Sequence, residues 1–262
     1  MFQHQTLRGR VISQILVVIC LLILVLPLGM ILLTSLQGEG ATNYVAVLTT
    51  TPFALFLWNS LVVSFCTVAI VLVSAILAAY GIVILRPRGA RVAMVAILAG
   101  MSLPAIALIV PLYSLVQRLG LLNTYWAVVV PLAAISIPFG VLVGANYIRG
   151  LPIELYEAAR LDGAGDFRFF WSILLPICRP ILAVIAIFTF LAAWNEYLLP
   201  LIFIQDTDLQ VLTQVPTYFQ SQRLVDTPKV FAANVLISLP IVLAYLLMQG
   251  MFRRGMSAGA LK

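Results

Sequence analysis

The polar residues of this sequence are concentrated in one window, residues 149–180. Only 9% of the 262 residues are charged, yet this window holds four of the nine acids and four of the fifteen bases. Glu154 lies where the dipole of a first helix favours an anion, and Gly163 can end that helix in the left-handed conformation. We expect Asp166 to cap a second helix that Pro176 interrupts. A short helix that ends at a glycine and carries small residues on one face can lie in a groove of another protein.

The residues that common catalytic chemistry requires are missing. The sequence has no Gly-x-x-x-x-Gly-Lys-Ser/Thr motif, and Lys229 and Lys262 are its only lysines, so a P-loop that binds ATP phosphates is excluded. The only histidine is His4, which excludes a histidine-based triad and a histidine-rich metal cluster. The three cysteines lie in or beside apolar stretches without paired spacing. We therefore predict that the chain is not an enzyme and binds neither metal nor cofactor.

The composition is typical of a membrane protein that crosses the bilayer several times. Apolar residues make up 63% of the chain and the mean hydropathy is +1.12, whereas soluble domains are about half apolar. A helix of about 20 apolar residues crosses the hydrocarbon core. We expect an all-α fold, a single transmembrane domain over residues 1–262 with six spans. The expected spans cover about residues 15–36, 59–85, 92–116, 125–148, 181–204 and 230–252.

The distribution of positive charge predicts the orientation. Six spans place both termini on one side of the membrane, and that side carries twelve of the fifteen lysines and arginines. The other side carries only Arg118, Arg223 and Lys229. By the positive-inside rule the richer side is cytoplasmic, which places the loop 149–180 and the tail 253–262 in the cytoplasm. This topology also explains the net charge of +6 without a nucleic-acid partner.

The loop resembles the EAA loop of ABC importer permeases, in which it engages the ATPase subunits. The pattern consists of Glu157-Ala158-Ala159, Asp162-Gly163-Ala164 and Ile173-x-Leu175-Pro176. The resemblance implies that the ATPase-coupling residues are Glu157, Ala158, Ala159, Asp162, Gly163, Ala164 and Pro176. The alternative is a plain amphipathic connector between two spans, which does not explain the whole pattern.

The resemblance extends over residues 59–262 and favours the carbohydrate-uptake branch. It includes Asn59-Ser60-Leu61, Ala78-Ala79-Tyr80 and a fifth-span signature, Trp194-Asn195-Glu196-Tyr197-Leu198-Leu199-Pro200-Leu201. The ending is similar to the Gly-x-x-x-Gly-Ala-x-Lys tail of the smaller, maltose-type permease subunit, which makes Gly255, Gly259 and Lys262 candidate tail contacts with the ATPases. The partners implied by the resemblance are a second permease subunit, two cytoplasmic ATPases that use ATP and Mg, an extracytoplasmic solute-binding protein and membrane lipid. The implied location is the cytoplasmic membrane of a bacterial or archaeal cell.

Glu196 is the only charged residue inside an expected span. Ionisable groups at membrane depth are costly and commonly functional, so we name Trp194, Asn195, Glu196 and Tyr197 as candidate residues of the solute pathway. Glu196 could instead bind a neighbouring helix or water. The two aromatic residues could stack on sugar rings or anchor the span at the membrane interface.

The sequence therefore predicts the transmembrane permease subunit of an ATP-driven importer for sugars or for sugar or polyol derivatives. One alternative is a secondary transporter driven by an ion gradient, which would show several intramembrane acids and an inverted repeat. The other is a non-transporting membrane scaffold or sensor, which would have no ATPase partner.

Overall fold

The computed structural model describes residues 7–221 and 225–259. Apart from one isolated bridge between Gln220 and Val225, these residues form only helices, turns and irregular connections. The expected all-α class is confirmed. The chain divides into two compact units, Met1–Phe53 with Val215–Pro240 and Ala54–Gln214 with Ile241–Lys262.

The first unit contains α1 (Leu7–Ser35), α2 (Thr42–Thr50) and the first part of α12 (Thr227–Gly259). Over residues 15–33 α1 is apolar around its whole circumference, with Pro27 inside this stretch, and its side chains from residue 13 onward are mostly exposed in the isolated chain. A surface of this kind is suited to lipid or to other apolar helices. α2 lies where the hydropathy pattern predicts only a loop, because a segment of nine residues is too short to give a span signal.

Polar side chains join the elements of the first unit. The Asn43 side chain donates to the carbonyls of Ser35 and Gln37 at 2.9 and 2.8 Å, which fixes α2 against the end of α1. Lys229 forms ion pairs with Asp226 at 2.9 Å and with Glu39 at 3.5 Å. The turn before α2 is thus linked to the start of α12.

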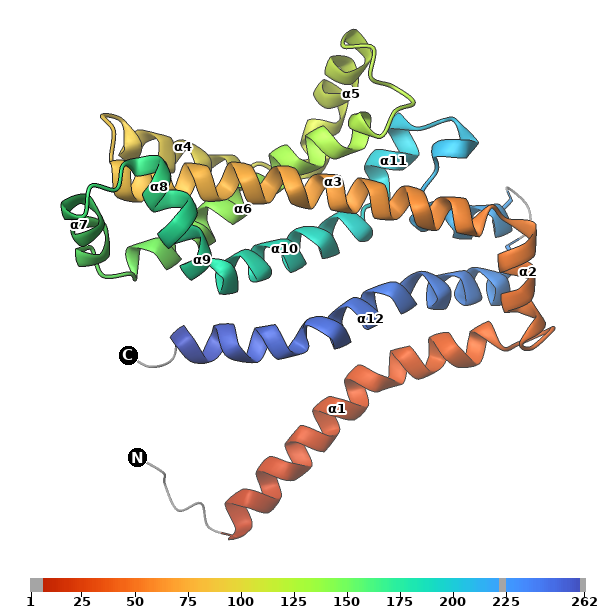
Figure 1. The fold of residues 1–262 in the computed structure, drawn as a ribbon. Coiled ribbons are helices and arrows are strands. Elements are labelled where there is room, and N and C mark those ends of the chain that lie inside the picture. Colours follow the sequence, from red (N-terminus) through yellow and green to blue (C-terminus); the bar gives the residue numbers. More distant parts are fainter. Residues whose placement is uncertain (1–6, 222–224, 260–262) are drawn as a thin grey trace. The chain divides into compact units, whose positions relative to one another are not determined.

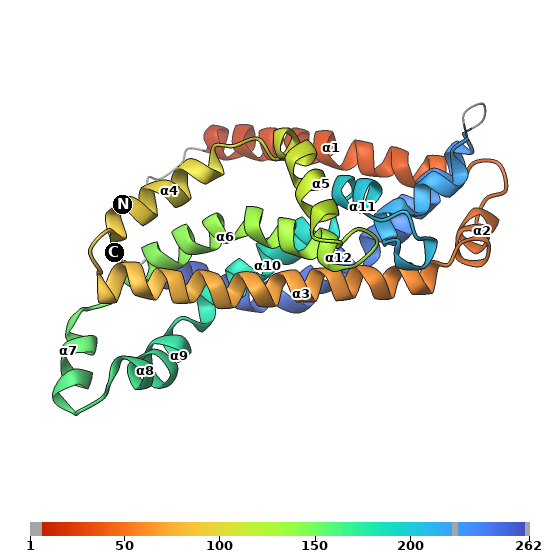
Figure 2. The ribbon, with the colours of Figure 1, turned by 90° about the horizontal axis from the view of Figure 1, so that it is seen from above.

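The second unit is built around three long helices. These are α3 (Phe53–Tyr80), which continues as a π-helical turn over Gly81–Leu85, α6 (Trp126–Arg149) and α10 (Arg179–Trp194). Figure 1 and Figure 2 show the three running alongside one another.

Glycines allow the three helices to approach closely. A Cβ at Gly140 of α6 would lie 2.8 Å from the Cβ of Ala75 and 3.3 Å from Cγ2 of Ile185. A Cβ at Gly144, one turn later, would lie 3.3 Å from the Cβ of Ala79. The Gly-x-x-x-Gly spacing on α6 therefore serves packing within the chain, against a small-residue face of α3.

Two of the expected spans are broken. The third expected span, residues 92–116, is divided into two helical segments. The first is α4 (Ala90–Met101), and the second covers residues 105–118 and includes α5 (Ile109–Arg118). The two segments are bent by 94° relative to each other. Pro104 adopts an extended conformation at this bend, and a proline also disfavours helix at the residue before it. Pro111 lies in the first turn of α5, where its missing N–H costs little.

The fifth expected span, residues 181–204, is also broken. Its helix α10 stops at Trp194, and a separate helix, α11 (Leu198–Phe203), follows after Asn195–Tyr197. At the far end of the chain α12 continues to Gly259, past the expected boundary at residue 252.

Six spans are therefore not confirmed. Within the described residues, three helices are long and apolar enough to cross a membrane: Ser13–Ser35, Phe53–Leu85 and Trp126–Arg149. The number rises to five if each of two bent pairs counts as one span, and the apolar part of α12, Thr227–Leu243, is shorter.

Candidate functional site

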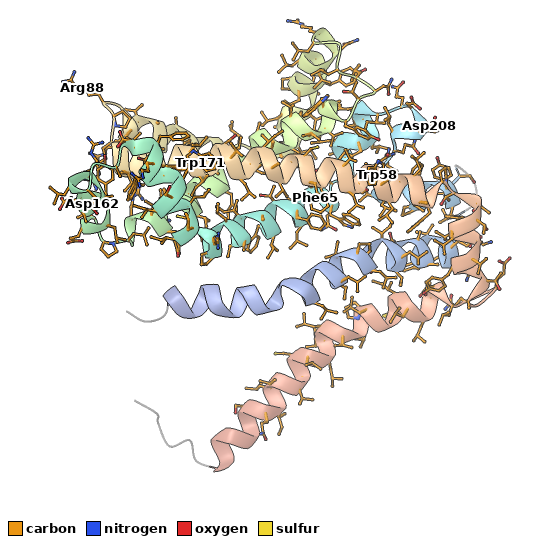
Figure 3. The ribbon with its side chains drawn as sticks, in the orientation of Figure 1. Trp58, Phe65, Arg88, Asp162, Trp171 and Asp208 are labelled. Atoms are coloured by element: carbon orange, nitrogen blue, oxygen red, sulfur yellow. The ribbon has the colours of Figure 1, made fainter. Side chains whose placement is uncertain are left out.

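The polar window folds into a pair of short helices at one end of the second unit (Figure 1). The first is α7 (Glu154–Leu161), and the second is α8 (Asp166–Phe169), which continues through a π-helical turn at Phe170–Leu174 into α9 (Leu175–Ile177). We call α7 to α9 the helix pair. In Figure 3, Asp162 of the helix pair and Arg88 lie at one end of the second unit, and Asp208 lies at the other.

Gly163 ends α7 as the sequence predicts. Its φ is +76°, in the left-handed region. The Gly163 N–H donates to the carbonyl of Arg160 and the Ala164 N–H to that of Ala159, so carbonyls of the last turn have partners. A Cβ at Gly163 would meet nothing within 4 Å. In this chain the need for glycine is therefore conformational rather than steric.

Asp166 does not cap the second helix, and this expectation is wrong. Gly165 occupies the cap position, and Asp166 is the first helical residue. Its Oδ1 instead accepts from the Tyr156 hydroxyl at 2.8 Å and faces Nη1 of Arg160 at 3.4 Å. This bond and burial both raise the pKa of Tyr156 above its ordinary value of 10.0, the bond more strongly. The side chain of Asp166 thus joins the two helices of the pair.

Pro176 does not interrupt the helix, which continues to Ile177. The π-helical turn before it supplies the reason. Its last bond runs from the Leu175 N–H to the carbonyl of Phe170, so the hydrogen-bonding pattern is already irregular where the proline, without an N–H, follows. The chain bends only later, by 74° between residues 166–177 and α10.

The two alanines of the motif have different environments. Ala158 is exposed, but Ala159 is 6% exposed and Ala164 is 8% exposed, and both pack in a core cluster with Tyr80, Phe169 and Phe170. A groove in a partner can therefore contact Ala158 directly but not Ala159. This corrects the expectation that the two alanines form one outward face.

Two apolar side chains project from the helix pair instead. Leu161 is 89% exposed and Phe167 is 79% exposed. Glu157 and Asp162 are also exposed. Leu161 follows the buried Ala159 by two residues and so lies on the opposite face of α7, a signal that the sequence already contains.

Tyr80 connects the helix pair to α3. Its hydroxyl donates to the carbonyl of Asp166 at 3.2 Å. Its ring lies 5.2 Å from that of Phe170 and 6.3 Å from that of Phe169, and Tyr156 contacts Phe169 edge-on at 5.0 Å. Packed rings and a hydrogen bond thus join the helix pair directly to α3.

The second candidate site, Trp194–Tyr197, forms the break between α10 and α11. Oε1 of Glu196 accepts from the N–H groups of Leu198 and Leu199 at 2.9 and 3.0 Å, so this carboxylate holds the first turn of α11. The Glu196 carbonyl accepts from the Thr213 hydroxyl at 2.8 Å. Asn195 donates to the carbonyl of Leu191.

The two aromatic residues at this break differ in access. Trp194 is 1% exposed and stacks on Phe190 at 5.4 Å, so in this conformation it neither reaches a solute nor anchors the span at the interface. Tyr197 is exposed. Of the four residues proposed for the pathway, Trp194 is therefore inaccessible.

The stretch after α11, expected to be a polar loop, is fastened to the start of α3. The Asn59 side chain donates to the carbonyls of Asp208 and Gln210 at 2.9 and 2.7 Å, and accepts from the Tyr125 hydroxyl at 2.7 Å. The hydroxyl of Ser60 accepts from the Leu212 N–H at 2.8 Å. Hydropathy could not reveal these bonds, which join residues between 66 and 152 positions apart.

The proposed tail contacts are only partly described. Gly255 and Gly259 belong to α12, whereas Lys262 lies outside the described residues. Among the described residues, no group of three or more His, Cys, Asp or Glu side chains could hold a metal ion.

Taken together, a helical fold with several long apolar helices and an exposed polar helix pair at one end is typical of an integral membrane protein. Residues 70–258 match the sequence model of the family described as "Binding-protein-dependent transport system inner membrane component". This match covers more than half of the chain, which therefore belongs to that family.

Similar proteins include sugar transport permeases. The chain is 31% identical to the diacetylchitobiose uptake system permease protein NgcG of Streptomyces coelicolor, over 97% of this chain and 90% of that protein. It is 33% identical to the trehalose/maltose transport system permease protein MalG of Thermococcus litoralis, over 84% and 80%. Its fold resembles a solved bacterial ABC transporter involved in import of the acidic polysaccharide alginate, with a TM-score of 0.80 and 21% identity, over 96% of this chain and 100% of that chain.

Proposed function

We propose that this chain is the transmembrane permease subunit of an ATP-driven importer for sugars or for sugar or polyol derivatives. The observation that carries the proposal is the exposed helix pair, joined to α3 through Tyr80, in a chain of this family. The names of the similar permeases support the sugar class. We infer a location in a bacterial or archaeal cytoplasmic membrane, with both termini in the cytoplasm.

The proposed partners are two ATPase subunits, a second permease subunit and an extracytoplasmic solute-binding protein. ATP and Mg are bound by the ATPases, which close on ATP and move the helix pair. Glu157, Ala158, Leu161, Asp162 and Phe167 form the surface offered to an ATPase, because all five are exposed. Ala159, Gly163, Ala164 and Pro176 shape the helices behind that surface.

Motion then reaches the spans along two routes. One is the packing of Tyr80 against the rings of Phe169 and Phe170, which moves α3. The other is the direct chain connection from α9 into α10 across its bend. Displacement of α3 and α10 switches the access of the solute pathway between the two sides of the membrane. Asn195, Glu196 and Tyr197 stay candidates for residues along that pathway.

Transport by the purified complex in lipid vesicles tests the proposal. Uptake of sugar delivered by the binding protein should require ATP and should survive collapse of the ion gradients by ionophores. Loss of uptake on collapse would identify a secondary transporter instead. Absence of both uptake and a co-purifying ATPase would identify a scaffold or sensor.

A charge reversal tests whether the helix pair is the coupling element. Glu157→Lys should abolish ATPase co-purification or its stimulation by loaded binding protein, since the partner would then meet a cation in place of an anion. Asp208→Lys is the matched control, because Asp208 lies at the other end of the second unit (Figure 3). Equal effects of the two reversals would contradict coupling through the helix pair.

A further inference from the structure

Three arginines line one groove at the end of the second unit that carries the helix pair. Arg86 ends the π-helical turn after α3, Arg91 lies in the first turn of α4, and Arg149 is the last residue of α6. Arg149 is distant in sequence from the other two, and all three are exposed. None of them forms an ion pair within the described part of the chain.

The guanidinium groups are partly oriented by hydrogen bonds. Nε of Arg86 donates to the carbonyl of Val83 at 2.8 Å, which leaves its two terminal nitrogens for another acceptor. Nη1 of Arg149 donates to Oδ1 of Asn146 at 3.1 Å. The first turn of α4 adds the positive end of a helix dipole beside Arg91. The basic part of the groove therefore favours an anion with several acceptor oxygens, such as a phosphate group.

The rest of the groove is apolar. Its volume is about 390 Å³, and its other lining side chains are Ile82, Val83, Ala90, Met94 and Val95. Val95 is 59% exposed and the adjacent Val92 is 72% exposed, so α4 presents an apolar surface that continues outward from the groove. A carboxylate of a partner protein or a free phosphate ion would leave this half of the groove empty. A molecule with an anionic head and a hydrocarbon tail would occupy both halves.

The groove also lies where such a molecule is available. The arginines stand at the ends of the apolar helices α3 and α6 and at the start of α4, which is the level at which a helix leaves the hydrocarbon core for the headgroup region. Basic pockets between membrane helices at this level are suited to anionic lipid headgroups.

We propose that this groove binds an anionic phospholipid, with the phosphate on Arg86, Arg91 and Arg149 and the start of an acyl chain along α4. The bound lipid would brace α4 against α6 and against the turn from which α7 begins, because Arg86 and Arg149 also border a smaller cavity lined by Leu155 and Tyr156. This inference requires that the chain is embedded in a membrane, but it does not require the proposed coupling function.

Lipid retention by the purified complex tests the proposal. The complex is exchanged into mixed micelles of phosphatidylcholine and phosphatidylglycerol and analysed by native mass spectrometry, which counts the lipids retained by each species. Arg91→Gln and Arg149→Gln should each lower phosphatidylglycerol retention about fivefold. Arg88→Gln is the matched control, since Arg88 is exposed in the same basic turn but does not line the groove.

A second variant tests the apolar half at constant charge. Val95→Trp should fill the tail region and lower phosphatidylglycerol retention while the complex stays assembled, because Val95 is exposed and the helix has room for the larger side chain. Phosphatidylcholine retention should not change in any variant. Binding assays of this kind leave transport and ATPase activity aside, so the lipid site and the proposed function can fail separately.

Four outcomes would overturn the proposal. An equal loss of phosphatidylglycerol retention in Arg88→Gln would show only a diffuse effect of surface charge. Unchanged phosphatidylglycerol retention in all variants would place the lipid elsewhere. Displacement by glycerol phosphate or by inorganic phosphate at low concentration would identify a free phosphate as the occupant. Lipid retention that appears only after the ATPases are stripped from the complex would identify the groove as part of the protein interface.

Discussion

Tyr156 and Asp166 are joined by a hydrogen bond of 2.8 Å that connects the two helices of the pair across the Gly163 turn. Tyr80 donates to the backbone carbonyl of the same Asp166. One residue therefore receives a bond from α7 and another from α3. Arg160 adds a charge interaction at 3.4 Å, but both partners are half-exposed, so it contributes little to stability.

Tyr156→Phe should loosen α7 against α8 without affecting the spans. The lost hydrogen bond is worth about 1 kcal/mol, so backbone amides of α7 should exchange with deuterium about fivefold faster in the purified complex. Asp166→Ala removes the acceptor of the same bond and should speed exchange in α7 to a similar extent. Tyr197→Phe, which lies outside the helix pair, is the control. Unchanged exchange in α7 would show that aromatic packing alone fixes the pair.

The same bond has a predictable pH dependence. Because the pKa of Tyr156 is raised above 10.0, the neutral hydroxyl is favoured in the folded state. Its contribution is fully present below pH 10.0 and is lost as pH rises through the raised value. The difference in exchange between wild type and Tyr156→Phe should therefore be constant across neutral pH and shrink only in strongly alkaline buffer.

Gly140→Ala should destabilise the packing of α6 against α3. The new Cβ would lie 2.8 Å from the Cβ of Ala75, so a backbone shift is required, at a cost of about 1–3 kcal/mol. Thermal unfolding in detergent measures the loss. Adding Ala75→Gly removes the clashing atom and should restore part of the stability. Gly100→Ala is the control, since a Cβ there meets nothing within 4 Å.

Glu196→Gln and Glu196→Ala separate a capping role from a role of charge in the solute pathway. Glutamine keeps the oxygen that accepts from the N–H groups of Leu198 and Leu199, whereas alanine removes it, at a cost of about 1 kcal/mol. We expect Glu196→Gln to retain transport and Glu196→Ala to lose a large part of it. An inactive but fully assembled Glu196→Gln complex would instead assign the negative charge to the pathway.

The sequence predicts well those elements that are determined locally. The long apolar runs of α3 and α6 and the glycine that ends α7 are examples, because hydropathy and backbone conformation decide them within a few residues. The breaks at Pro104 and at Asn195–Tyr197 are averaged out in a window of span length. The burial of Trp194, the inward face of Ala159 and the bonds from Asn59 to Asp208 and Gln210 depend on residues distant in sequence, which no local pattern encodes.

Impermeant thiol labelling tests the topology. After replacement of Cys20, Cys66 and Cys178, single cysteines at Arg88 and Asp162 should be unreactive in intact cells and reactive after permeabilisation. Cysteines at Glu39 and Asp208 should react from outside. The structure places Arg88 and Asp162 at one end of the second unit and Asp208 at the other (Figure 3), so labelling of residues 162 and 208 from the same side would contradict both the topology and the fold.

The adjacent alanines of the motif allow the sharpest test of the docking surface. Ala158→Trp adds a bulky side chain on the exposed face of α7. This variant should insert into the membrane and have the thermal stability of the wild type, but its ATPases should no longer co-purify with it. Ala159→Trp places the same side chain in the core cluster around Tyr80 and Phe169, where overpacking costs about 1–3 kcal/mol or more. It should therefore lower thermal stability before any ATPase is added. If Ala158→Trp instead kept its ATPases and their stimulation by loaded binding protein, the partner would bind another face of the helix pair. Leu161 and Phe167 are the two most exposed apolar side chains of that pair. In that case Leu161→Asp and Phe167→Asp would be the variants that lose ATPase binding.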